Sequence, residues 1–519
     1  MEKKQILNMD VCFLNASSAK KSYQKLSETY SAIESPTWAL LLAQSCRSVG
    51  FNVSIIDANA ENLSDEQVLD RIKKINPRIL CLVVYGQNVN AGTTNMRGAT
   101  DITNFLKKNK ISCPVAFIGS HVQALPIESL KEEKNIDIVF TNEGVYALRN
   151  LLKLKSFSSN ELKNIKGIAF REGEKINMNL PEKVVPTDKM DIDLPGYAWD
   201  LLPYKEVPMD LYRSPMWHAE YDFKKRSPYA SLQTSLGCVF KCDFCMINLI
   251  NRNDNEEIGV AGKYSNMRFW SPEFIIKEFD KLIAMGVKTI RIVDEMFLLN
   301  PKYYVPLCEK LALRNKNDEL RMWSYSRIDT VKRPEILKLV RKAGIKWLCL
   351  GIESGDKAVR LEVAKGKFED VDVKAVINKV HEADINVMGN YIFGLPGDTK
   401  ETMKKTFDLS KELCTAGWNA YAAMALPGSQ LYKNAVDKKY KLPNNYEGYS
   451  FHSYETQPLP TETLKPEEIL EYRDKSFNNY HTHKPFLDRI EKKFGRKAVE
   501  NIKEMTKINL KRKIIEEQL

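Results

Sequence analysis

Short apolar runs alternate with amphipathic stretches through the first part of the chain. The runs are rich in Val, Ile, Leu and Phe, as buried strands are, and the stretches between them carry apolar residues at helical spacing. One helical stretch begins at Ser35 and Pro36 and ends at Gly50, and another begins at Ser64. This alternation predicts an α/β domain with a doubly wound parallel sheet. The predicted strands are residues 10–15, 52–57, 78–85, 114–119 and 136–140.

Polar segments follow four of these strands. Ligands of a doubly wound sheet bind at the carboxyl ends of its strands. We therefore predict a ligand-binding domain, although the pattern does not identify the ligand. The segments are NASS (15–18), YGQNVN (85–90), GSH (119–121) and TNEG (141–144).

The pattern changes in the next seventy or so residues. Residues 165–179 predict a small hairpin, and the six prolines that follow interrupt any periodic pattern. We interpret this part as a linker that wraps a surface. The prolines stand at positions 181, 186, 195, 203, 208 and 215.

Six longer strand and helix units follow the linker. One helix begins at Ser271 and Pro272 and ends at Gly286. Six successive units predict a partial (β/α)6 barrel of the TIM type, whose chemistry lies at the carboxyl ends of its strands. Beyond residue 430 the pattern is mainly helical. The predicted strands are 229–235, 287–294, 321–328, 345–354, 386–396 and 419–427, and the predicted domains are 1–154, 155–222 (linker), 223–430 and 431–519.

Composition favours a cytoplasmic protein of several globular domains. The chain has 519 residues and a formal net charge of +11. Its longest apolar run, residues 79–85, is too short to span a membrane, and its first residues contain no apolar signal core. The basic balance admits an anionic substrate, but no RNA-binding motif accompanies it, so nucleic acid is not an expected partner.

Three of the ten cysteines stand together as GCVFKCDFC. Cys238, Cys242 and Cys245 have the spacing C-x3-C-x2-C and follow the first predicted barrel strand. A structural zinc site needs four ligands, and no second pair completes one. Three thiolates on a four-iron cluster leave one iron open for a substrate or cofactor. A chance group of buried thiols is the remaining alternative, and the other seven cysteines are single, as reduced buried thiols are.

At these residues the chain resembles the radical S-adenosylmethionine (SAM) superfamily, whose hallmark is CxxxCxxC with an aromatic residue, here Phe244, before the last cysteine. The resemblance implies a 4Fe–4S cluster held by the three cysteines. It also implies SAM on the open iron, where reductive cleavage gives a 5'-deoxyadenosyl radical. Other strand ends match the family's SAM contacts, and the resemblance makes Asp294, Glu295, Ser326, Arg327, Glu353, Ser354, Gly394 and Pro396 candidates.

Each of these contacts has a simpler alternative. Arg327 can pair with Asp329 or Glu353 across the barrel mouth, and Gly394 and Gly397 can be turn glycines without a ligand. The family's Gly-Gly-Glu stands here as Val-Asp-Glu, at residues 293–295.

The first half resembles the Rossmann-like cobalamin-binding domain of cobalamin-dependent radical SAM enzymes, through residues 34–69, 114–126 and 136–152. Cobalamin contacts are implied at Gly119, Ser120, His121, Glu143 and Gly144. The signature that offers a histidine to cobalt is absent after the first strand, so the resemblance implies cobalamin whose lower face is free of a protein histidine. His121 either faces the corrin or is an ordinary surface hydrogen-bonding residue.

The resemblance implies a cobalamin-dependent radical methyltransferase acting on an unactivated carbon of a small-molecule, lipid or sugar precursor. It also implies a reducing partner such as flavodoxin or ferredoxin. A non-methylating radical SAM enzyme of rearrangement, cyclisation or oxidation shares all these residues, and a non-enzymatic cobalamin- or cluster-binding regulator is the third alternative. A methylthiotransferase needs three more clustered cysteines, which the chain lacks.

Overall fold

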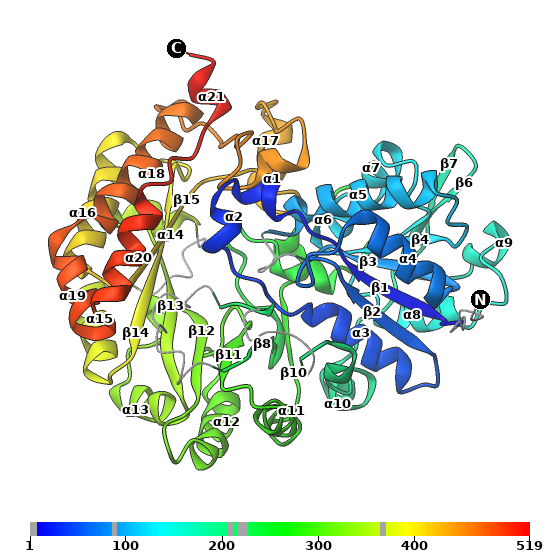
Figure 1. The fold of residues 1–519 in the computed structure, drawn as a ribbon. Coiled ribbons are helices and arrows are strands. Elements are labelled where there is room, and N and C mark those ends of the chain that lie inside the picture. Colours follow the sequence, from blue (N-terminus) through cyan, green and yellow to red (C-terminus); the bar gives the residue numbers. More distant parts are fainter. Residues whose placement is uncertain (1–7, 86–90, 205–210, 215–226, 364–369, 519) are drawn as a thin grey trace.

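The computed structural model describes residues 8–85, 91–204, 211–214, 227–363 and 370–518. Two α/β units lie side by side, one built on the first half of the chain and one on the second (Figure 1). Prolines 208 and 215 and residues 86–90 of the predicted YGQNVN segment lie outside the described residues. No described helix is long and apolar enough to cross a bilayer.

The first unit is a seven-stranded sheet of order β2-β1-β3-β4-β5-β6-β7. All five predicted strands are present and parallel. The hairpin predicted within the linker is also present, but β6 pairs antiparallel with β5 and so extends this sheet. The strands are β1 (Val11–Asn15), β2 (Val53–Asp57), β3 (Ile79–Val83), β4 (Val115–Ile118), β5 (Ile138–Phe140), β6 (Ile168–Glu172) and β7 (Lys175–Met178).

Helices cover both faces of this sheet because its strands are buried on both sides. Val11 and Phe13 of β1 face one core, and the alternate residues Cys12 and Leu14 face the other. Ser64 begins α4 with a capping box to Gln67. The helices are α1 (Ala19–Tyr23), α2 (Leu26–Thr29), α3 (Thr37–Arg47), α4 (Asp65–Ile75), α5 (Gly92–Lys108), α6 (Ser120–Ala124), α7 (Pro126–Glu132), α8 (Val145–Leu152), α9 (Ser159–Leu162) and α10 (Met190–Asp193).

The second unit is a six-stranded, all-parallel sheet of order β15-β14-β13-β12-β11-β8, an open half-barrel. All six predicted strands are present. A short antiparallel pair, β9 with β10, was not predicted. The strands are β8 (Tyr229–Leu232), β9 (Ser235–Cys238), β10 (Asn266–Phe269), β11 (Thr289–Ile292), β12 (Arg321–Arg327), β13 (Ile345–Glu353), β14 (Asn386–Phe393) and β15 (Gly417–Ala422).

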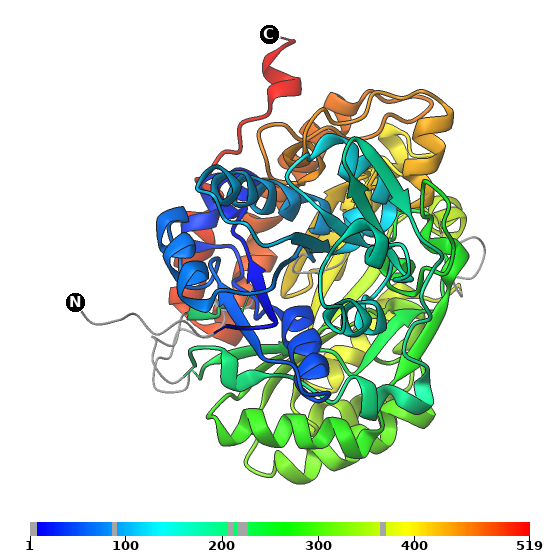
Figure 2. The ribbon, with the colours of Figure 1, turned by 90° about the vertical axis from the view of Figure 1, so that its right-hand side faces the viewer.

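The outer side of the half-barrel is covered by helices, as Figures 1 and 2 show. Ser271 caps α11 through the N–H of Phe274, and Pro272 occupies its first turn, as predicted. The chain beyond β15 is mainly helical, as predicted. The helices are α11 (Pro272–Ala284), α12 (Pro301–Arg314), α13 (Pro334–Lys342), α14 (Lys357–Val363), α15 (Val373–Glu382), α16 (Lys400–Leu413), α17 (Gln430–Asp437), α18 (Pro466–His481), α19 (Lys484–Phe494), α20 (Arg496–Thr506) and α21 (Lys513–Glu516).

The open edge of the half-barrel at β8 is closed by side chains from the first half of the chain and the segment after it. The N–H of Ser231 donates to Ser35 Oγ at 3.0 Å, and the hydroxyl of Tyr204 donates to the carbonyl of Tyr229 at 3.0 Å. The N–H of Gln233 donates to the hydroxyl of Tyr197 at 2.7 Å. An edge strand that would otherwise present unpaired backbone groups is satisfied in this way.

Three buried arginines of the second unit reach into the first. Arg252 donates to the carbonyl of Gln123. Arg268 forms an ion pair with Glu143 at 2.7 Å, and Arg291 forms one with Glu34 at 2.7 Å. A buried cation without its partner is costly, so these contacts hold the two units in one arrangement.

Candidate active site

The cysteine motif lies on a tightly shaped loop at the carboxyl end of the half-barrel. Cys238 is the last residue of β9. The motif was predicted to follow the first barrel strand, β8, directly, but β9 lies between them. Gly237 has a φ of 81°, and a Cβ there would collide with the carbonyl of Asn266. The N–H of Cys238 donates to Asn248 Oδ1 at 2.8 Å, and Asn248 Nδ2 donates to the carbonyl of Phe240 at 3.2 Å. Turn geometry and hydrogen bonds therefore fix the conformation of this loop.

All three thiols of this loop are free and largely removed from water. Burial raises the pKa of Cys238 to about 11 and that of Cys242 to about 12, and it also raises the pKa of Cys245 well above its usual value. The thiols of Cys238 and Cys242 add to the rise at Cys245, which shows that the three are neighbours. Buried thiols of this kind become thiolates only beside a cation.

The donor set fits an iron–sulfur cluster better than a single ion. Among the described residues no three His, Cys, Asp or Glu side chains converge on one ion-sized position. A four-iron cluster holds its thiolates further apart than one ion does, with each sulfur on a different iron. Three neighbouring thiols on one short loop meet that requirement.

Asp294 and Glu295, predicted as SAM contacts, have different environments. The carboxylate of Asp294 accepts from the N–H and the hydroxyl of Thr234, both at 2.6 Å, and from the hydroxyl of Ser235 at 2.5 Å. Asp294 therefore fixes the start of β9. Glu295 accepts no hydrogen bond from the described residues, and burial raises its pKa to about 7. Its charge reaches Cys238 and Cys245, so it faces the cysteine loop.

Ser326 and Arg327 end β12 beside the same loop. The N–H of Leu298 donates to Ser326 Oγ at 3.0 Å, so this hydroxyl holds the segment after β11. Arg327 Nε donates to Asp329 at 2.8 Å, which is one of the two simpler alternatives predicted for it. The guanidinium lies 3.6 Å from the ring centroid of Phe240 within the motif. Its charge lowers the pKa of Cys238 and Cys242, against the larger effect of burial.

Glu353 is a second carboxylate that faces the thiols. It has a φ of 63°, uncommon for a residue with a side chain, and it ends β13. Burial raises its pKa to about 7, and Arg327 opposes the rise. Ser354 is fully buried, and its hydroxyl accepts from the N–H of Asp356 at 3.1 Å, so it shapes the following turn.

Gly394 and Pro396 lie in the turn after β14. The N–H of Gly394 donates to Asp398 at 2.9 Å, and a Cβ on Gly394 would lie 2.7 Å from Ile469 of α18. Pro396 is exposed. Gly394 is thus required by packing and turn geometry, as the simpler alternative predicted. Phe244, before the last cysteine, packs against the apolar side of the loop.

In the first unit, Gly119, Ser120 and His121 lie where β4 ends. A Cβ on Gly119 would collide with the carbonyl of Val84, and Ser120 is fully buried. His121 is buried: its Nδ1 lies 3.2 Å from Thr93 Oγ1, and its ring packs edge-on to Tyr446. Burial lowers the pKa of His121 to about 4. His121 is therefore a neutral interior residue, and the prediction of a surface histidine is wrong.

Glu143 and Gly144 follow β5 and connect the two units. Glu143 pairs with Arg268 and accepts from the N–H of Val185 at 2.5 Å. Gly144 has a φ of 77° and begins α8. These partners account for both residues without a ligand.

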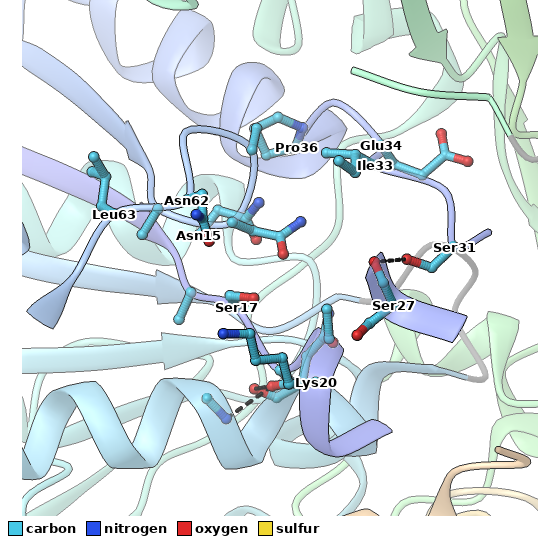
Figure 3. Close-up of a pocket in the computed structure, with 18 of the residues that line it drawn as sticks. Asn15, Ser17, Lys20, Ser27, Ser31, Ile33, Glu34, Pro36, Asn62 and Leu63 are labelled. Atoms are coloured by element: carbon cyan, nitrogen blue, oxygen red, sulfur yellow. Dashed lines mark hydrogen bonds between the residues drawn. The ribbon is translucent and has the colours of Figure 1, made fainter. Parts of the chain in front are cut away.

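A cavity of about 700 Å³ opens at the carboxyl ends of β1 and β3. The chain turns to opposite sides of the sheet after these two neighbouring strands, which is where doubly wound sheets bind ligands. Figure 3 shows the amides of Asn15 and Asn62 pointing into it, with Lys20 reaching in from α1. Ser17 also lines the cavity. The five predicted cobalamin contacts do not line it.

The sequence predictions missed three residues that line this cavity: Lys20, Tyr23 and Asn62. They belong to segments that follow β1 and β2, and position after a strand end was the signal that could have found them. The amide, hydroxyl and ammonium groups of this cavity fit cobalamin, whose corrin carries amide side chains and whose nucleotide tail carries a phosphate. The histidine of the β4 end is turned away from it, toward Thr93 and Tyr446.

Two family models match the chain in the order of the two units. Residues 25–152 match the B12 binding domain, and residues 232–410 match the Radical SAM superfamily. The second match contains the cysteine loop and the ends of β11 to β14.

Known proteins of similar sequence and fold agree with both matches. An uncharacterized methyltransferase of Pyrococcus horikoshii is 26% identical over 400 residues, which are 77% of this chain and 78% of the relative. The anaerobic magnesium-protoporphyrin IX monomethyl ester cyclase of Cereibacter sphaeroides is 24% identical over 463 residues, 86% of this chain and 66% of that protein. The radical SAM methyltransferase TsrM of Kitasatospora setae, solved with cobalamin and a [4Fe-4S] cluster, superposes with a TM-score of 0.62 at 15% identity, over 83% of this chain and 78% of TsrM.

Proposed function

Because the chain belongs to the radical SAM enzymes that carry a B12-binding domain, whose cofactors are a 4Fe–4S cluster, SAM and cobalamin, we propose that it methylates an unactivated carbon atom. The observation that carries the proposal is the position of the cysteine loop. Its three thiols lie near Glu295 and Glu353, two carboxylates that accept no hydrogen bond from the described residues, and an ion pair joins the half-barrel to the first sheet.

In this proposal Cys238, Cys242 and Cys245 hold the cluster through three of its irons. When bound, the cluster and SAM together supply a radical that removes a hydrogen atom from the substrate. Glu295 is the acceptor for the ammonium group of SAM, because it accepts no hydrogen bond from the described residues and its charge acts on Cys238 and Cys245. Glu353 is the acceptor for its ribose hydroxyls. Asp294 has a positioning role, since Thr234 and Ser235 already use its oxygens.

Cobalamin would be held at the cavity of the first sheet. Asn15 and Asn62 are placed to hydrogen-bond the amide groups of the corrin, and Lys20 is placed to meet the phosphate of the nucleotide tail. The buried pair Glu34–Arg291 joins the wall of this cavity to the inside of the half-barrel. The protein therefore supplies a fixed separation of the two cofactor sites, which a methyl transfer between them requires.

A non-methylating radical reaction is the second candidate. The relative from Cereibacter sphaeroides is a cyclase, and it aligns with more of this chain than the methyltransferase of Pyrococcus horikoshii does. The site residues are shared by both reaction types, so the fate of the methyl group decides between them. A cobalamin- or cluster-binding regulator would bind the cofactors without consuming SAM.

The proposal includes a small-molecule, lipid or sugar substrate, a cytoplasmic location, and a one-electron donor such as flavodoxin or ferredoxin. A low-potential donor would be needed because the cluster, when bound, would supply one electron to SAM. The test is anaerobic incubation with cobalamin, a reductant and SAM carrying a CD3 group, with a metabolite extract as the source of substrate. Methyl transfer predicts a product heavier by the labelled methyl group. A changed product without label would support the second candidate, and no consumption of SAM would support the regulator.

A further inference from the structure

The inner face of the half-barrel is polar where its strands end. Strand register places Arg327, Gly351, Asn390 and Asn419 side by side on four adjacent strands, so their side chains share one face. The alternate residues, such as Leu350, are fully buried toward the outer helices. Gly351, Asn390 and Asn419 are partly exposed although they face inward. Solvent therefore reaches the inside of the half-barrel at this level, in contrast to the filled core of a closed barrel.

Four polar groups on this inner side have no hydrogen-bond partner among the described residues. They are the amide oxygen of Asn419, the hydroxyls of Tyr421 and Tyr23, and the ring nitrogens of His452. Asn419 uses only its Nδ2, which donates to Asn390 Oδ1 at 3.3 Å. All four residues are partly buried. Because these groups are partly exposed and unused by the described residues, four together offer hydrogen-bonding positions to a ligand.

The four groups are neighbours, although they come from three parts of the chain. The ring centroids of Tyr23 and His452 lie 5.5 Å apart, and those of Tyr421 and Phe451 lie 4.4 Å apart. Charge interaction with Tyr23 adds to the rise in the pKa of Tyr421. Asn419 and Tyr421 are two residues apart on β15 and share the inner face.

This cluster lies between the two proposed cofactor sites. Tyr23 lines the cavity of the first sheet. At the other end, Asn390 lies beside Gly351, which is next to Arg327 in strand register. A substrate has to meet the radical on one side and the methyl donor on the other, so its place is between them.

The charge behind the cluster is positive. Arg473 and Arg512 both contact Asp474, so two guanidinium groups share one carboxylate. Burial, together with the charges of Arg473 and Arg512, lowers the pKa of His452 to about 3, so this ring is neutral. Burial raises the pKa of Tyr421 to about 12, so its hydroxyl keeps its proton. Neutral donors backed by a net positive charge favour an oxygen acceptor.

We propose that Tyr23, Tyr421 and His452 donate hydrogen bonds to the substrate, and that the substrate is a polar molecule presenting a carboxylate or carbonyl oxygen to them. The amide oxygen of Asn419 accepts from a hydrogen-bond donor of the same molecule. The inference rests on the proposed function and narrows its substrate class. A hydrocarbon substrate would leave these groups unpaired and buried, which costs free energy at each of them. Sugar and lipid precursors qualify only if they carry such an oxygen acceptor.

A labelling experiment tests the class of substrate. The reconstituted holoenzyme is incubated with CD3-labelled SAM and, separately, with the aqueous and the chloroform–methanol extracts of the source cells. The inference predicts label in an aqueous product that contains a carboxylate or carbonyl group. Label only in an apolar lipid would overturn it.

Variants test the residues at equal iron and cobalamin content. Tyr421→Phe and His452→Phe keep the rings and remove the polar atoms, and each is expected to lower the labelled product about fivefold or more, as loss of a hydrogen bond does. Tyr454→Phe, an exposed tyrosine whose hydroxyl donates to Glu516, is the matched control and is expected to match the unaltered enzyme. Full labelling in both site variants would overturn the assignment.

A binding measurement separates this inference from methyl transfer. Benzoate and toluene are compared by ligand-observed NMR on the unaltered protein and on the Tyr421→Phe/His452→Phe double variant. Benzoate is expected to bind the unaltered protein and to lose that binding in the double variant, while toluene shows no such difference. Absent benzoate binding, or equal binding in both proteins, would contradict the inference even if methyl transfer were established.

Discussion

Glu34 Oε1 lies 2.7 Å from Arg291 Nη1, and the two residues belong to different units of the molecule. The guanidinium is enclosed by the rings of Trp323 and Tyr325, with its carbon 4.6 and 5.1 Å from their centroids. Tyr229 donates to the second oxygen of Glu34 at 2.6 Å. The wall of the first cavity and the interior of the half-barrel are thereby joined through one buried ion pair.

Replacing Glu34 with Ala should leave the buried guanidinium of Arg291 without its carboxylate partner. We expect the free energy of unfolding to fall by about 3–5 kcal/mol, measured by urea denaturation of the cofactor-free protein. Asp200→Ala is the matched control, because Asp200 pairs with Arg47 at the surface, and its loss should cost about 0–1 kcal/mol. Equal effects of the two substitutions would show that the pair does not join the units.

The adjacent acids Asp294 and Glu295 should respond differently to substitution. Asp294→Ala removes the acceptor of three hydrogen bonds at the start of β9, so we expect lower iron content after anaerobic reconstitution. Glu295→Gln leaves β9 intact, so iron content should be retained while SAM affinity falls about 10- to 100-fold, as loss of a charge-assisted contact does. Iron assays and equilibrium dialysis measure the two effects, and the reverse pattern would exchange the proposed roles.

Glu353 gives the cofactor-free protein a distinctive pH dependence. Because burial raises its pKa from 4.5 to about 7, the folded chain keeps a proton that the unfolded chain has released. The stability from this protonated group is present below pH 4.5 and is lost as pH rises through 7. Glu353→Gln removes the titration, so the variant should gain on the order of 2 kcal/mol relative to the unaltered protein between pH 5 and pH 8. A pH-independent difference in denaturation midpoints would contradict this.

His121 should not be a cobalt ligand. It is buried against Thr93 and Tyr446 and does not line the cavity. In the cobalamin-loaded protein we expect the cobalt(II) electron paramagnetic resonance spectrum to be the same in His121→Gln and the unaltered enzyme. Thermal stability should fall, because a packed interior ring is replaced. Nitrogen splitting that disappears in the variant would instead identify His121 as the lower ligand.

Strand positions were predictable because the predicted strands of both sheets are parallel to one another and buried. Their strands are continuous apolar runs between capped helices, and all eleven predicted strands of the two units appear as such. The pair β9–β10 was missed because Ser235–Cys238 reads as a continuation of β8. The turn that separates them is made by Thr234 and Ser235 bonding to Asp294, about sixty residues later, and no local pattern reports such a contact.

The cysteine loop was predictable because its ligand chemistry is encoded in spacing. The side-chain partners of the other site residues could not be predicted from the sequence. Glu143 appeared to be a ligand contact from its place after β5, but its partner Arg268 comes from β10 of the other unit. Likewise Tyr23 and His452 are more than four hundred residues apart in the chain, and only the fold brings their rings together. Position after a strand end finds candidates, whereas burial and pairing decide their roles.

The central claim is that Cys238, Cys242 and Cys245 hold a cluster that cleaves SAM. The most direct measurement is the release of 5'-deoxyadenosine from SAM by anaerobically reconstituted, dithionite-reduced protein, with iron and sulfide determined on the same sample. The account predicts about four irons per chain and SAM cleavage in the unaltered protein and in the control Cys414→Ala, and neither in Cys242→Ala. Zinc or no metal at the loop, or SAM cleavage that persists in Cys242→Ala, would contradict it.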